Sequence, residues 1–429
     1  MREMKDSGID WINNTPATWE IKRIKAVLVE RNESNNPVKT DFILSLTNDR
    51  GVIPYADKGE IGNKSKDDLS GYKLAYPNDI VLNSMNVFIG SVALSIYYGC
   101  VSPVYYMLYT RYKKDNIKYY NYLFQTQELQ KKLHGYGNGI MDIRMRIQMS
   151  KLNTVMIPIP PSEEQHKIAD YLDKKCSKID AIIKKQQTVI EELKAYKLSV
   201  ITEAVTKGLN PDVKMKDSGI KWVDSIPSKW ENRKMLSILS MRVVDGPHES
   251  PELFDEGIPY ISATAVVNGK IDFSLMRGYI SSEYCDECDK RYKPKQGDIL
   301  VIKLGASTGK VAMVETNDRF NIWVPLAAVR CNEEAFPRFV YYAFQSDYFL
   351  RQMELSWTFG TQQTLGVKTI EQLRILLPPI SEQGEISTYL DIKCSAIDNV
   401  IAHKEAIIEK LTSYKKSLIY EVVTGKKEI

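Results

Sequence analysis

The chain has 429 residues, of which 43% are hydrophobic and 26% are charged, and its net charge is +4. This length exceeds one ordinary hydrophobic core, so two domains with connections are expected. The composition is that of a globular protein. The sequence has no run of eighteen apolar residues, so no membrane span is predicted. Six scattered cysteines are typical of a reducing compartment, so we expect a cytoplasmic protein. The small positive charge is compatible with nucleic acid as a partner but does not by itself indicate it.

The same phrase occurs twice in the chain. MKDSGIDWINNTPATWE and MKDSGIKWVDSIPSKWE align without a gap, and so do two segments of more than forty residues each. Repeats at such spacing indicate a duplicated structural unit. We therefore interpret the chain as two copies of a variable globular part followed by a long helix. The matching pairs of segments are 4–20 with 215–231, 78–94 with 297–313, and 164–206 with 382–424.

Residues 164–206 and 382–424 are expected to form the two long helices. Their apolar residues recur at steps of three, four or seven, which places them in one stripe on a helix. Proline, serine and acidic residues precede each helix, and Gly208 with Pro211 ends the first. Because the two stripes match, we expect an antiparallel two-helix coiled coil. The alternative is two unrelated helices, each packed on its own domain. The stripe residues are Ile168, Leu172, Ile179, Ile183, Ile190, Leu193, Val200, Ile386, Leu390, Ile397, Ile401, Ile408, Leu411 and Leu418.

The remaining parts of each unit are expected to be mixed and mostly β. Short apolar runs bounded by Gly, Asn and Asp are typical of strands and tight turns. One amphipathic helix is predicted in each copy, at 118–133 and 338–353, each followed by a glycine-bearing loop. The predicted fold is α+β, with two such domains separated by the coiled coil and related by an internal pseudo-twofold duplication. The expected boundaries are 1–157, 158–209, 210–378 and 379–429.

Motifs for catalysis or metal binding are not found. GASTGKV (305–311) has three residues between its glycines and a valine after Lys310, so a turn between strands is expected instead of a phosphate-binding loop. Cys285 and Cys288 have the spacing of one half of a zinc site, but no second pair lies nearby. The four histidines are dispersed, and neither an amino-methylation motif nor a glycine-rich cofactor-binding turn occurs. These observations favour binding over catalysis, so we expect no catalytic residue and no metal site.

Three phrases together carry a specific resemblance. DSGIKWVDSIPSKWE opens a unit, GDIL…GASTGKVAM lies in its middle and LLPPISEQGEISTYLDIKCSAID closes it. In this order, and in both units, they resemble the DNA-specificity subunit of a type I restriction-modification system. The resemblance implies two target-recognition domains that each read one half of a bipartite asymmetric site in double-stranded DNA. It implies two methyltransferase subunits and restriction subunits as partners, and no membrane.

The same resemblance implies a subunit without chemistry or cofactor of its own. S-adenosylmethionine, ATP and Mg belong to the partner subunits. The helices would act as a spacer and a docking platform. At just over forty residues each helix is about 60–65 Å long, which suits half-sites centred between about one and two turns of DNA apart.

Base readout requires polar side chains on loops that can enter a groove, and phosphate contacts require cations or free amides. We expect these in the loop 134–151 of the first unit and its counterpart 357–368 in the second, with earlier polar turns as a second choice. A solvated loop is the alternative for each residue taken singly. The candidates are Tyr136, Asn138, Arg144, Arg146, Gln148, Asn83, Ser84, Asn86, Lys303, Ser307, Thr308, Lys310, Thr361, Gln362, Gln363 and Lys368.

The tryptophan pairs at 11/19 and 222/230 are interpreted as anchors to the frame, since stacking platforms serve single strands. The polar faces of the helices are candidate docking surfaces, through Lys184, Lys185, Glu191, Glu192, Glu405 and Lys410. Two rival hypotheses remain: an autonomous enzyme with its own methylation or cleavage site, and an interaction scaffold that no longer binds DNA.

Overall fold

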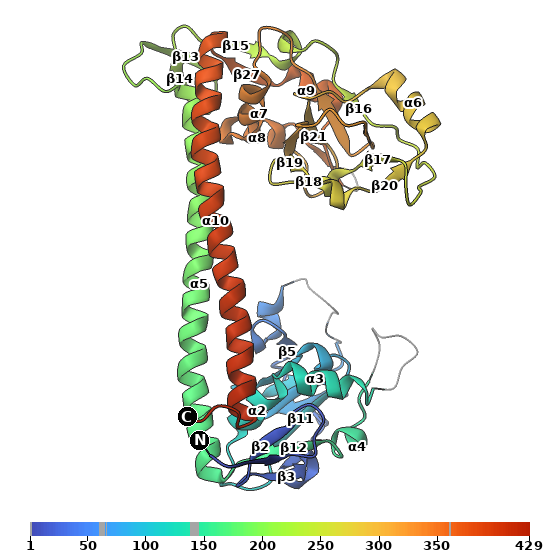
Figure 1. Ribbon diagram of the computed structural model, residues 1–429, viewed down its shortest axis with the longest axis vertical. Coiled ribbons are helices and arrows are strands. Elements are labelled where there is room, and N and C mark those ends of the chain that lie inside the picture. Colours follow the sequence, from blue (N-terminus) through green and yellow to red (C-terminus); the bar gives the residue numbers. More distant parts are fainter. Residues whose placement is uncertain (1, 60–64, 66, 138–145, 360–361) are drawn as a thin grey trace. The chain divides into compact units, whose positions relative to one another are not determined.

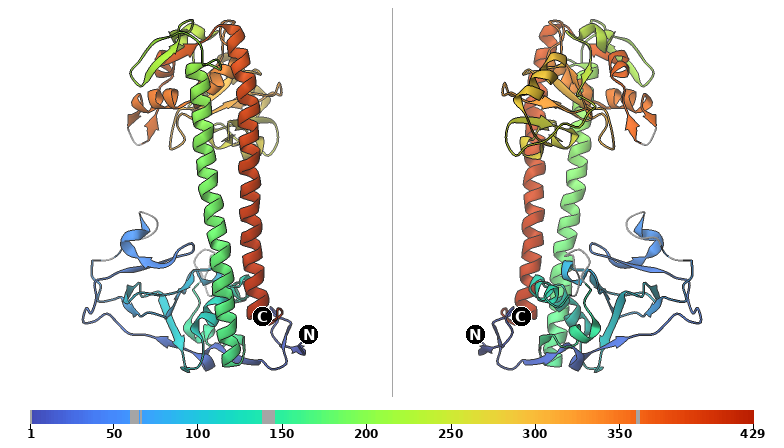
Figure 2. Two further views of the ribbon diagram at one scale, coloured as in Figure 1. Left: turned by 90° about the vertical axis from the view of Figure 1, so that its left-hand side faces the viewer. Right: turned by 90° about the vertical axis from the view of Figure 1, so that its right-hand side faces the viewer.

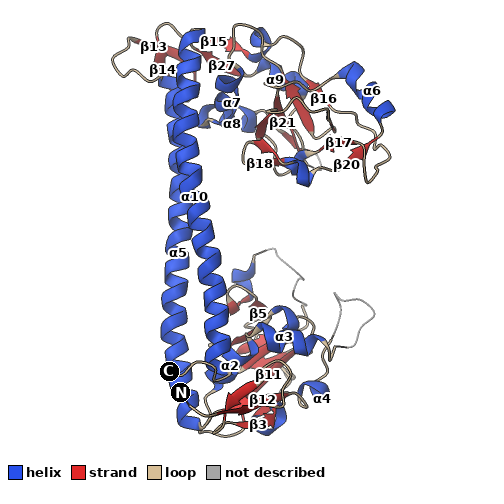
Figure 3. Ribbon diagram, in the orientation of Figure 1, coloured by secondary structure: helices blue, strands red, loops and turns tan. Residues whose placement is uncertain are grey.

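The computed structural model describes residues 2–59, 65, 67–137, 146–359 and 362–429 (Figure 1). It has the predicted α+β fold, with helices and short strands mixed in each globular part (Figure 3). The chain divides into two compact units, the first made of 1–186 with 405–429 and the second of 187–404. Each unit therefore contains one globular domain and one half of each long helix.

The first unit is built on a four-stranded antiparallel sheet in the order β4-β11-β8-β9, with β3 paired to β12 beside it. Its strands are β1 (Met4–Asp6), β2 (Asn14–Pro16), β3 (Glu20–Arg23), β4 (Leu28–Arg31), β5 (Leu44–Thr47), β6 (Gly51–Pro54), β7 (Lys73–Ala75), β8 (Ile80–Asn83), β9 (Val92–Leu94), β10 (Gly99–Val101), β11 (Tyr105–Thr110) and β12 (Met156–Ile159). Its helices are α1 (Ile24–Val27), η1 (Tyr55–Lys58), η2 (Val87–Ile89), α2 (Ile117–Phe124), α3 (Gln127–His134), α4 (Met149–Leu152), the first part of α5 (Ser162–Lys207) and the last part of α10 (Ile380–Val423).

The second unit repeats this plan, with a four-stranded antiparallel sheet in the order β16-β24-β21-β22 and β15 paired to β27. Its strands are β13 (Met215–Ile220), β14 (Val223–Pro227), β15 (Glu231–Lys234), β16 (Val244–Asp245), β17 (Ile258–Ile261), β18 (Val266–Val267), β19 (Lys270–Ile271), β20 (Gly278–Ile280), β21 (Ile299–Ile302), β22 (Val311–Met313), β23 (Asn321–Ile322), β24 (Leu326–Val329), β25 (Thr358–Phe359), β26 (Gln363–Thr364) and β27 (Arg374–Leu377). Its helices are the last part of α5, η4 (Met235–Ile238), η5 (Ala263–Ala265), η6 (Phe273–Leu275), α6 (Ser282–Arg291), α7 (Pro337–Gln345), α8 (Asp347–Leu355), α9 (Val367–Gln372) and the first part of α10.

Within each unit α5 and α10 lie side by side and run antiparallel (Figures 1 and 2). One ion pair joins them in the first unit, Lys415 Nζ to Asp180 Oδ2 at 2.6 Å. The duplicated pair joins them in the second, Lys197 Nζ to Asp398 Oδ2 at 2.6 Å. All fourteen residues of the predicted stripe are buried or half-buried. The helices thus meet each other along the stripe in both units.

The ends of the helices also pack on the globular domains, as in the alternative to a coiled coil. In the first unit Ile168 and Leu172 of α5 share a core with Val422 and Val423 of α10 and with the sheet. In the second unit Ile386 and Leu390 of α10 share a core with Ile201 and Val205 of α5. Packing against the other helix and packing on a domain therefore occur together.

The second tryptophan of each pair anchors the frame, as predicted. Trp19 and Trp230 are both 0% exposed. The indole N–H of Trp19 donates to Glu164 at 2.8 Å, and that of Trp230 donates to Glu382 at 3.1 Å. Each carboxylate lies in the first turn of a long helix, so the bond fastens the start of that helix to the domain.

The single helices expected at 118–133 and 338–353 are each two helices. The chain leaves the α conformation at Thr126 and at Ser346, where ψ is 134° and 150°. Each hydroxyl donates to the carbonyl three residues earlier, at 2.7 and 2.6 Å. Such back-bonding residues favour helix ends over helix interiors, so an amphipathic pattern alone did not show the break.

The duplicated aspartates Asp79 and Asp298 are buried and paired to arginine. Asp298 accepts from Nε and Nη2 of Arg330, both at 2.7 Å, from the Tyr292 hydroxyl at 2.6 Å and from the Lys295 amide at 2.9 Å. This carboxylate raises the pKa of Arg330 through the hydrogen bond. Asp298 therefore ties the start of β21 to the end of the neighbouring strand β24. Asp79 ties the start of β8 to Arg31 at the end of β4, which lies on the other side of β11.

Replacing Asp298 with Asn should destabilise the protein by about 3–5 kcal/mol, because Arg330 would keep a part-buried charge without its partner. Urea unfolding followed by circular dichroism measures this loss. Asp255→Asn, at an exposed position of the same unit, is the matched control and should stay within about 0.5 kcal/mol. Equal midpoints for the two variants would contradict the assigned role of Asp298.

Candidate nucleic-acid interface

In the first unit the structure brings two predicted segments together. The Ile147 amide donates to the Ser84 carbonyl at 2.9 Å, and the Tyr106 hydroxyl donates to the Ile147 carbonyl at 3.1 Å. These bonds hold the segment before α4 beside the end of β8. We call residues 146–148 with the turn 83–86 the first reading segment.

The candidates of this segment differ in exposure. Arg146 and Gln148 are exposed, Asn83 and Asn86 are half-buried, and Ser84 is buried. Tyr136 is half-buried and packs against the core. Asn83 Oδ1 accepts from the Met85 amide at 3.0 Å, so it shapes the turn. Asn138 and Arg144 lie outside the described residues.

The second unit places the equivalent segments in the same relation. The Leu365 amide donates to the Lys303 carbonyl at 2.8 Å, and the Gly305 amide donates to the Gln363 carbonyl at 3.0 Å. The loop 303–310, which joins β21 to β22 as expected, therefore lies against 362–368, and together they form the second reading segment. Gln362, Lys310 and Lys368 are exposed, whereas Ser307 and Gln363 are half-buried. Thr361 lies outside the described residues.

Two candidates of the second reading segment do not face solvent. Thr308 is 8% exposed and donates to the Gly305 carbonyl at 2.7 Å. Lys303 is 7% exposed, and its ammonium lies 2.8 Å from Asp245. A direct DNA contact expected of Lys303 does not fit this position. Its carbonyl holds the reading segment, and its charge is used inside the domain.

Asp245 is surrounded by basic groups. Besides Lys303 it pairs with Arg291, and His248 Nε2 lies 3.2 Å from its second oxygen. Burial acts to raise the pKa of Asp245, but Lys303 and the other basic groups outweigh it and hold that pKa below its usual value. The cluster fixes β16 to Lys303, the first residue of the loop after β21, and so holds one end of the second reading segment in place.

Lys303→Gln should lower stability by about 3 kcal/mol, because a buried carboxylate loses its nearest partner. Lys310→Gln, seven residues along the same loop and exposed, should stay within about 0.5 kcal/mol. If Lys310 contacts a DNA phosphate, Lys310→Gln should also lower the slope of log K against log salt for DNA binding by about 1. Thermal melts of both variants measure stability, and salt titrations of DNA binding measure phosphate contacts. A lower salt slope for Lys303→Gln would contradict the assignment of Lys303 to a buried ion pair.

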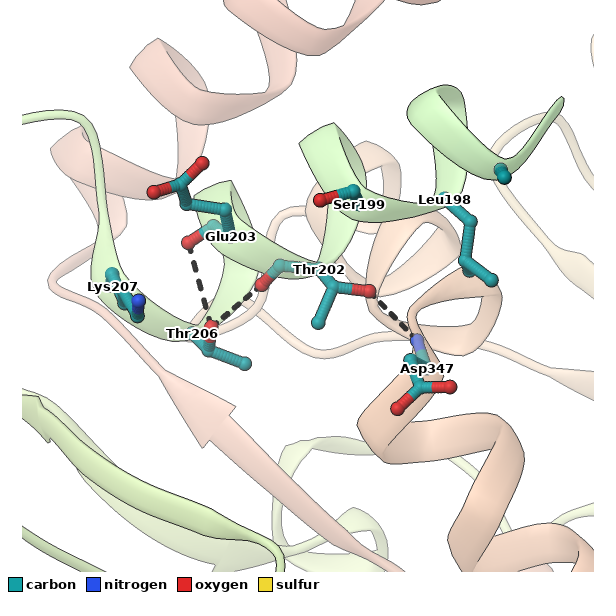
Figure 4. A pocket seen from close by; sticks show the side chains of 8 residues that line it. Leu198, Ser199, Thr202, Glu203, Thr206, Lys207 and Asp347 are labelled. Carbon is teal, nitrogen blue, oxygen red and sulfur yellow. Dashed lines mark hydrogen bonds between the residues drawn. The ribbon is translucent and has the colours of Figure 1, made fainter. Parts of the chain in front are cut away.

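A hollow with a volume of about 460 Å³ lies on the side of α5 (Figure 4). Thr202, Glu203, Thr206 and Lys207 line it from α5, and Asp347 lines it from the start of α8. Thr206 Oγ1 donates to the Thr202 carbonyl at 2.6 Å, and Thr202 Oγ1 accepts from the Asp347 amide at 2.8 Å. In these hydrogen bonds the two hydroxyls have backbone partners, so they stabilise the backbone and are not activated by a side chain that could act as a general base.

A smaller hollow of about 260 Å³ lies against α5 in the first unit and includes Cys176. Burial raises the pKa of this thiol to about 11, as it does for its duplicate Cys394 in the second unit. Both thiols are therefore protonated at neutral pH and poor nucleophiles. The hydroxyl of Tyr122, beside Cys176, donates to Asp173 at 2.7 Å, and Tyr342 repeats the bond to Asp391 at 2.5 Å.

The candidate docking residues of α5 and α10 (Lys184, Lys185, Glu191, Glu192, Glu405 and Lys410) are all exposed. Among the residues the structure describes, no three His, Cys, Asp or Glu side chains gather as a metal site. None of the helices in the described part of the chain combines the length and hydrophobicity that a bilayer crossing requires.

Comparison with known proteins identifies the family. A family model for the type I restriction modification DNA specificity domain matches residues 16–192 and again 227–413. The chain therefore belongs to the family of type I restriction-modification DNA specificity proteins. The two matched ranges correspond to the two copies of the duplicated unit.

Individual relatives cover nearly the whole chain. The putative type I restriction enzyme MjaX specificity subunit of Methanocaldococcus jannaschii is 26% identical over 430 residues, which cover 97% of this chain and 95% of that protein. The MjaVIII specificity subunit of the same organism is 23% identical over 424 residues, 96% of this chain and 93% of that one. A solved chain from work on complex assembly and conformational transition of the type I R-M system has the same fold, with a TM-score of 0.69 at 14% identity over 96% of this chain and 99% of that one.

Proposed function

We propose that this chain is the subunit that reads a bipartite, asymmetric site in double-stranded DNA and directs its partners to that site. The observation that carries the proposal is the duplicated reading segment. In both units a loop before a short helix is hydrogen-bonded to the end of a central strand, through Ile147 to Ser84 and through Leu365 to Lys303. The frame is repeated, so each domain presents side chains from the equivalent segment.

The exposed polar side chains of the two reading segments differ, and they stand at different positions of the shared frame. The first segment presents Arg146 and Gln148, and the second presents Gln362 and Lys368. Arginine favours guanine and glutamine favours adenine in the major groove. Two domains with the same frame and different donors read different half-sites, so the complete site is asymmetric.

The chain itself is proposed to be non-catalytic and to need no cofactor. This rests on the family and on the absence of methylation, cleavage and nucleotide-binding motifs from the sequence. Methyl transfer from S-adenosylmethionine would belong to two methyltransferase subunits, and the ATP- and Mg-dependent steps to restriction subunits. DNA in the cytoplasm would be the substrate of the assembly.

Mapping of methylated bases across the genome tests the proposal. Cells with this chain and its methyltransferase partner should show a split motif of two different half-sites about a fixed spacer, and cells that lack the chain should not. Identical methylation in both cells would contradict the function. Purified chain with labelled S-adenosylmethionine and DNA should transfer no methyl group, and transfer by the chain alone would favour an autonomous enzyme.

Exchange of residues 21–155 for the matching part of a relative with another specificity should change one half-site only. The exchanged part contains the first reading segment, while Trp19, Glu164 and both long helices stay in place. Methylation mapping of the hybrid reports both half-sites at once. If both half-sites changed together, the two domains would not read independently.

A further inference from the structure

Exposed basic side chains occur on four segments of the first unit that backbone contacts bring together. These segments are the first reading segment, α4, α1 and the turn between β11 and α2. We call this set the basic strip, and all its members are exposed. They are Arg146, Lys151, Lys25, Arg111, Lys113 and Lys114.

Backbone contacts join the parts of the strip, which are far apart in sequence. The Lys25 amide donates to the Asn153 carbonyl at 3.4 Å, two residues after Lys151. Arg111 Nη2 donates to the Lys25 carbonyl at 3.0 Å, and the Arg111 amide donates to the Val27 carbonyl at 2.7 Å. The strip is therefore fixed to the sheet and not carried on a free loop.

Few acidic groups among the described residues lie near the strip: the Lys114 charge acts on the carboxylates of Glu20 and Asp115, and Glu20 is itself paired with Lys22. Within the described ranges, the side chains of Lys25, Lys113, Lys114 and Lys151 form no ion pair. Asp115, the acidic residue in the same turn, is half-buried and accepts from the Tyr120 hydroxyl at 3.4 Å. The strip thus presents a net positive surface to solvent.

The second unit provides an internal comparison. Its Asn332 amide donates to the Ile238 carbonyl at 2.9 Å, as Arg111 does to Val27, and Leu365 takes the place of Ile147. These bonds and the shared η4/α1 position identify the residues that correspond to the strip. They are Thr364, Thr369, Leu236, Asn332, Glu333 and Glu334.

The corresponding surface therefore carries two acidic groups and no basic one. Glu333 and Glu334 are both exposed, and Glu334 pairs with Arg233 at 2.9 Å. The duplication kept the frame of this surface, but only the first copy has the basic side chains. Because the second copy has the same fold without these basic side chains, the fold does not require them.

We propose that the basic strip, apart from Arg146 in the reading segment itself, binds the phosphodiester backbone of the DNA duplex that the first reading segment engages, and so anchors one side of the complex without regard to sequence. This inference rests on the proposed function. Lysine and arginine are the usual partners of DNA phosphates. Lysine is depleted at protein–protein interfaces, whereas four of the six residues in the strip are lysine. Contact with DNA therefore fits the strip better than contact with an acidic protein.

The test compares two variants of the complex assembled with the methyltransferase partner. In the strip variant Lys25, Lys113, Lys114 and Lys151 are changed to Gln, which removes side chains without ion pairs and leaves Arg111 in place. In the control, the exposed residues Lys214, Lys216, Lys221 and Lys229 of the second unit are changed to Gln. Binding of duplexes with the intact or the mutated site is measured from 0.05 to 0.3 M salt.

The strip variant should lower the slope of log K against log salt by about 3 to 4, because each phosphate contact is worth roughly 0.9. It should weaken binding to both duplexes by the same factor, at least about tenfold at 0.1 M salt, and the control should keep the wild-type slope. Site preference should be unchanged, since phosphate contacts carry no sequence information.

An unchanged slope in the strip variant would overturn the proposal. Unchanged DNA binding combined with weaker assembly with the methyltransferase or restriction subunits would also overturn it, in favour of an acidic protein partner. A wild-type complex that binds the intact and the mutated site equally well would contradict the proposed function instead. The slopes of log K against log salt on the same duplexes would still show whether the strip contacts phosphates.

Discussion

Each globular domain completes its hydrophobic core with segments of both long helices, and the rest of the structure depends on this sharing. In the first unit Leu418 and Val422 of α10 are buried with Tyr119, Ile157 and Leu172. In the second unit Ala204 and Val205 of α5 are buried with Phe339 and Leu390. Burial of apolar area is the dominant favourable term in folding, so neither the domains nor the helices are separable modules. A reading segment is placed with respect to α5 and α10 because the same core holds both.

Duplication explains which features recur and which do not. The indole-to-glutamate bonds, the buried aspartates before a central strand, the lysine–aspartate pairs between helices and the sheet order all occur twice. The arginines that pair with the aspartates come from different strands in the two copies. The indoles and the aspartates are buried, where a change costs several kcal/mol. The lysine–aspartate pairs between the helices are partly exposed and contribute less. The reading segments and the basic strip are on the surface, where the two copies were free to diverge. Residues that differ between the two copies therefore indicate function in this protein, and residues that are the same in both copies indicate packing.

The helices, the repeat and the buried tryptophans could be predicted from the sequence, because each depends on local spacing or on an exact match. The break at Ser346 could not, since its cause is one hydroxyl that bonds backward within an otherwise helical pattern. Lys303 was expected to contact DNA, and its burial depends on Asp245, nearly sixty residues away. The basic strip was also beyond a linear pattern, because its residues come from four segments that backbone contacts bring together. Sequence patterns located the reading loops, but the support beneath them required the fold.

The position of the last residues of the chain has a consequence for biosynthesis. The side chains of Tyr119 and Arg2 donate to the carbonyls of Val423 and Gly425, respectively. The second unit is one continuous stretch, whereas the first needs residues 405–429 to close its core. At 5–20 residues per second, a ribosome takes roughly 10–50 s to reach that segment after the first domain has emerged. The domain that is made first is thus the last to be finished, and during that interval its uncovered apolar surface is open to chaperones and proteases.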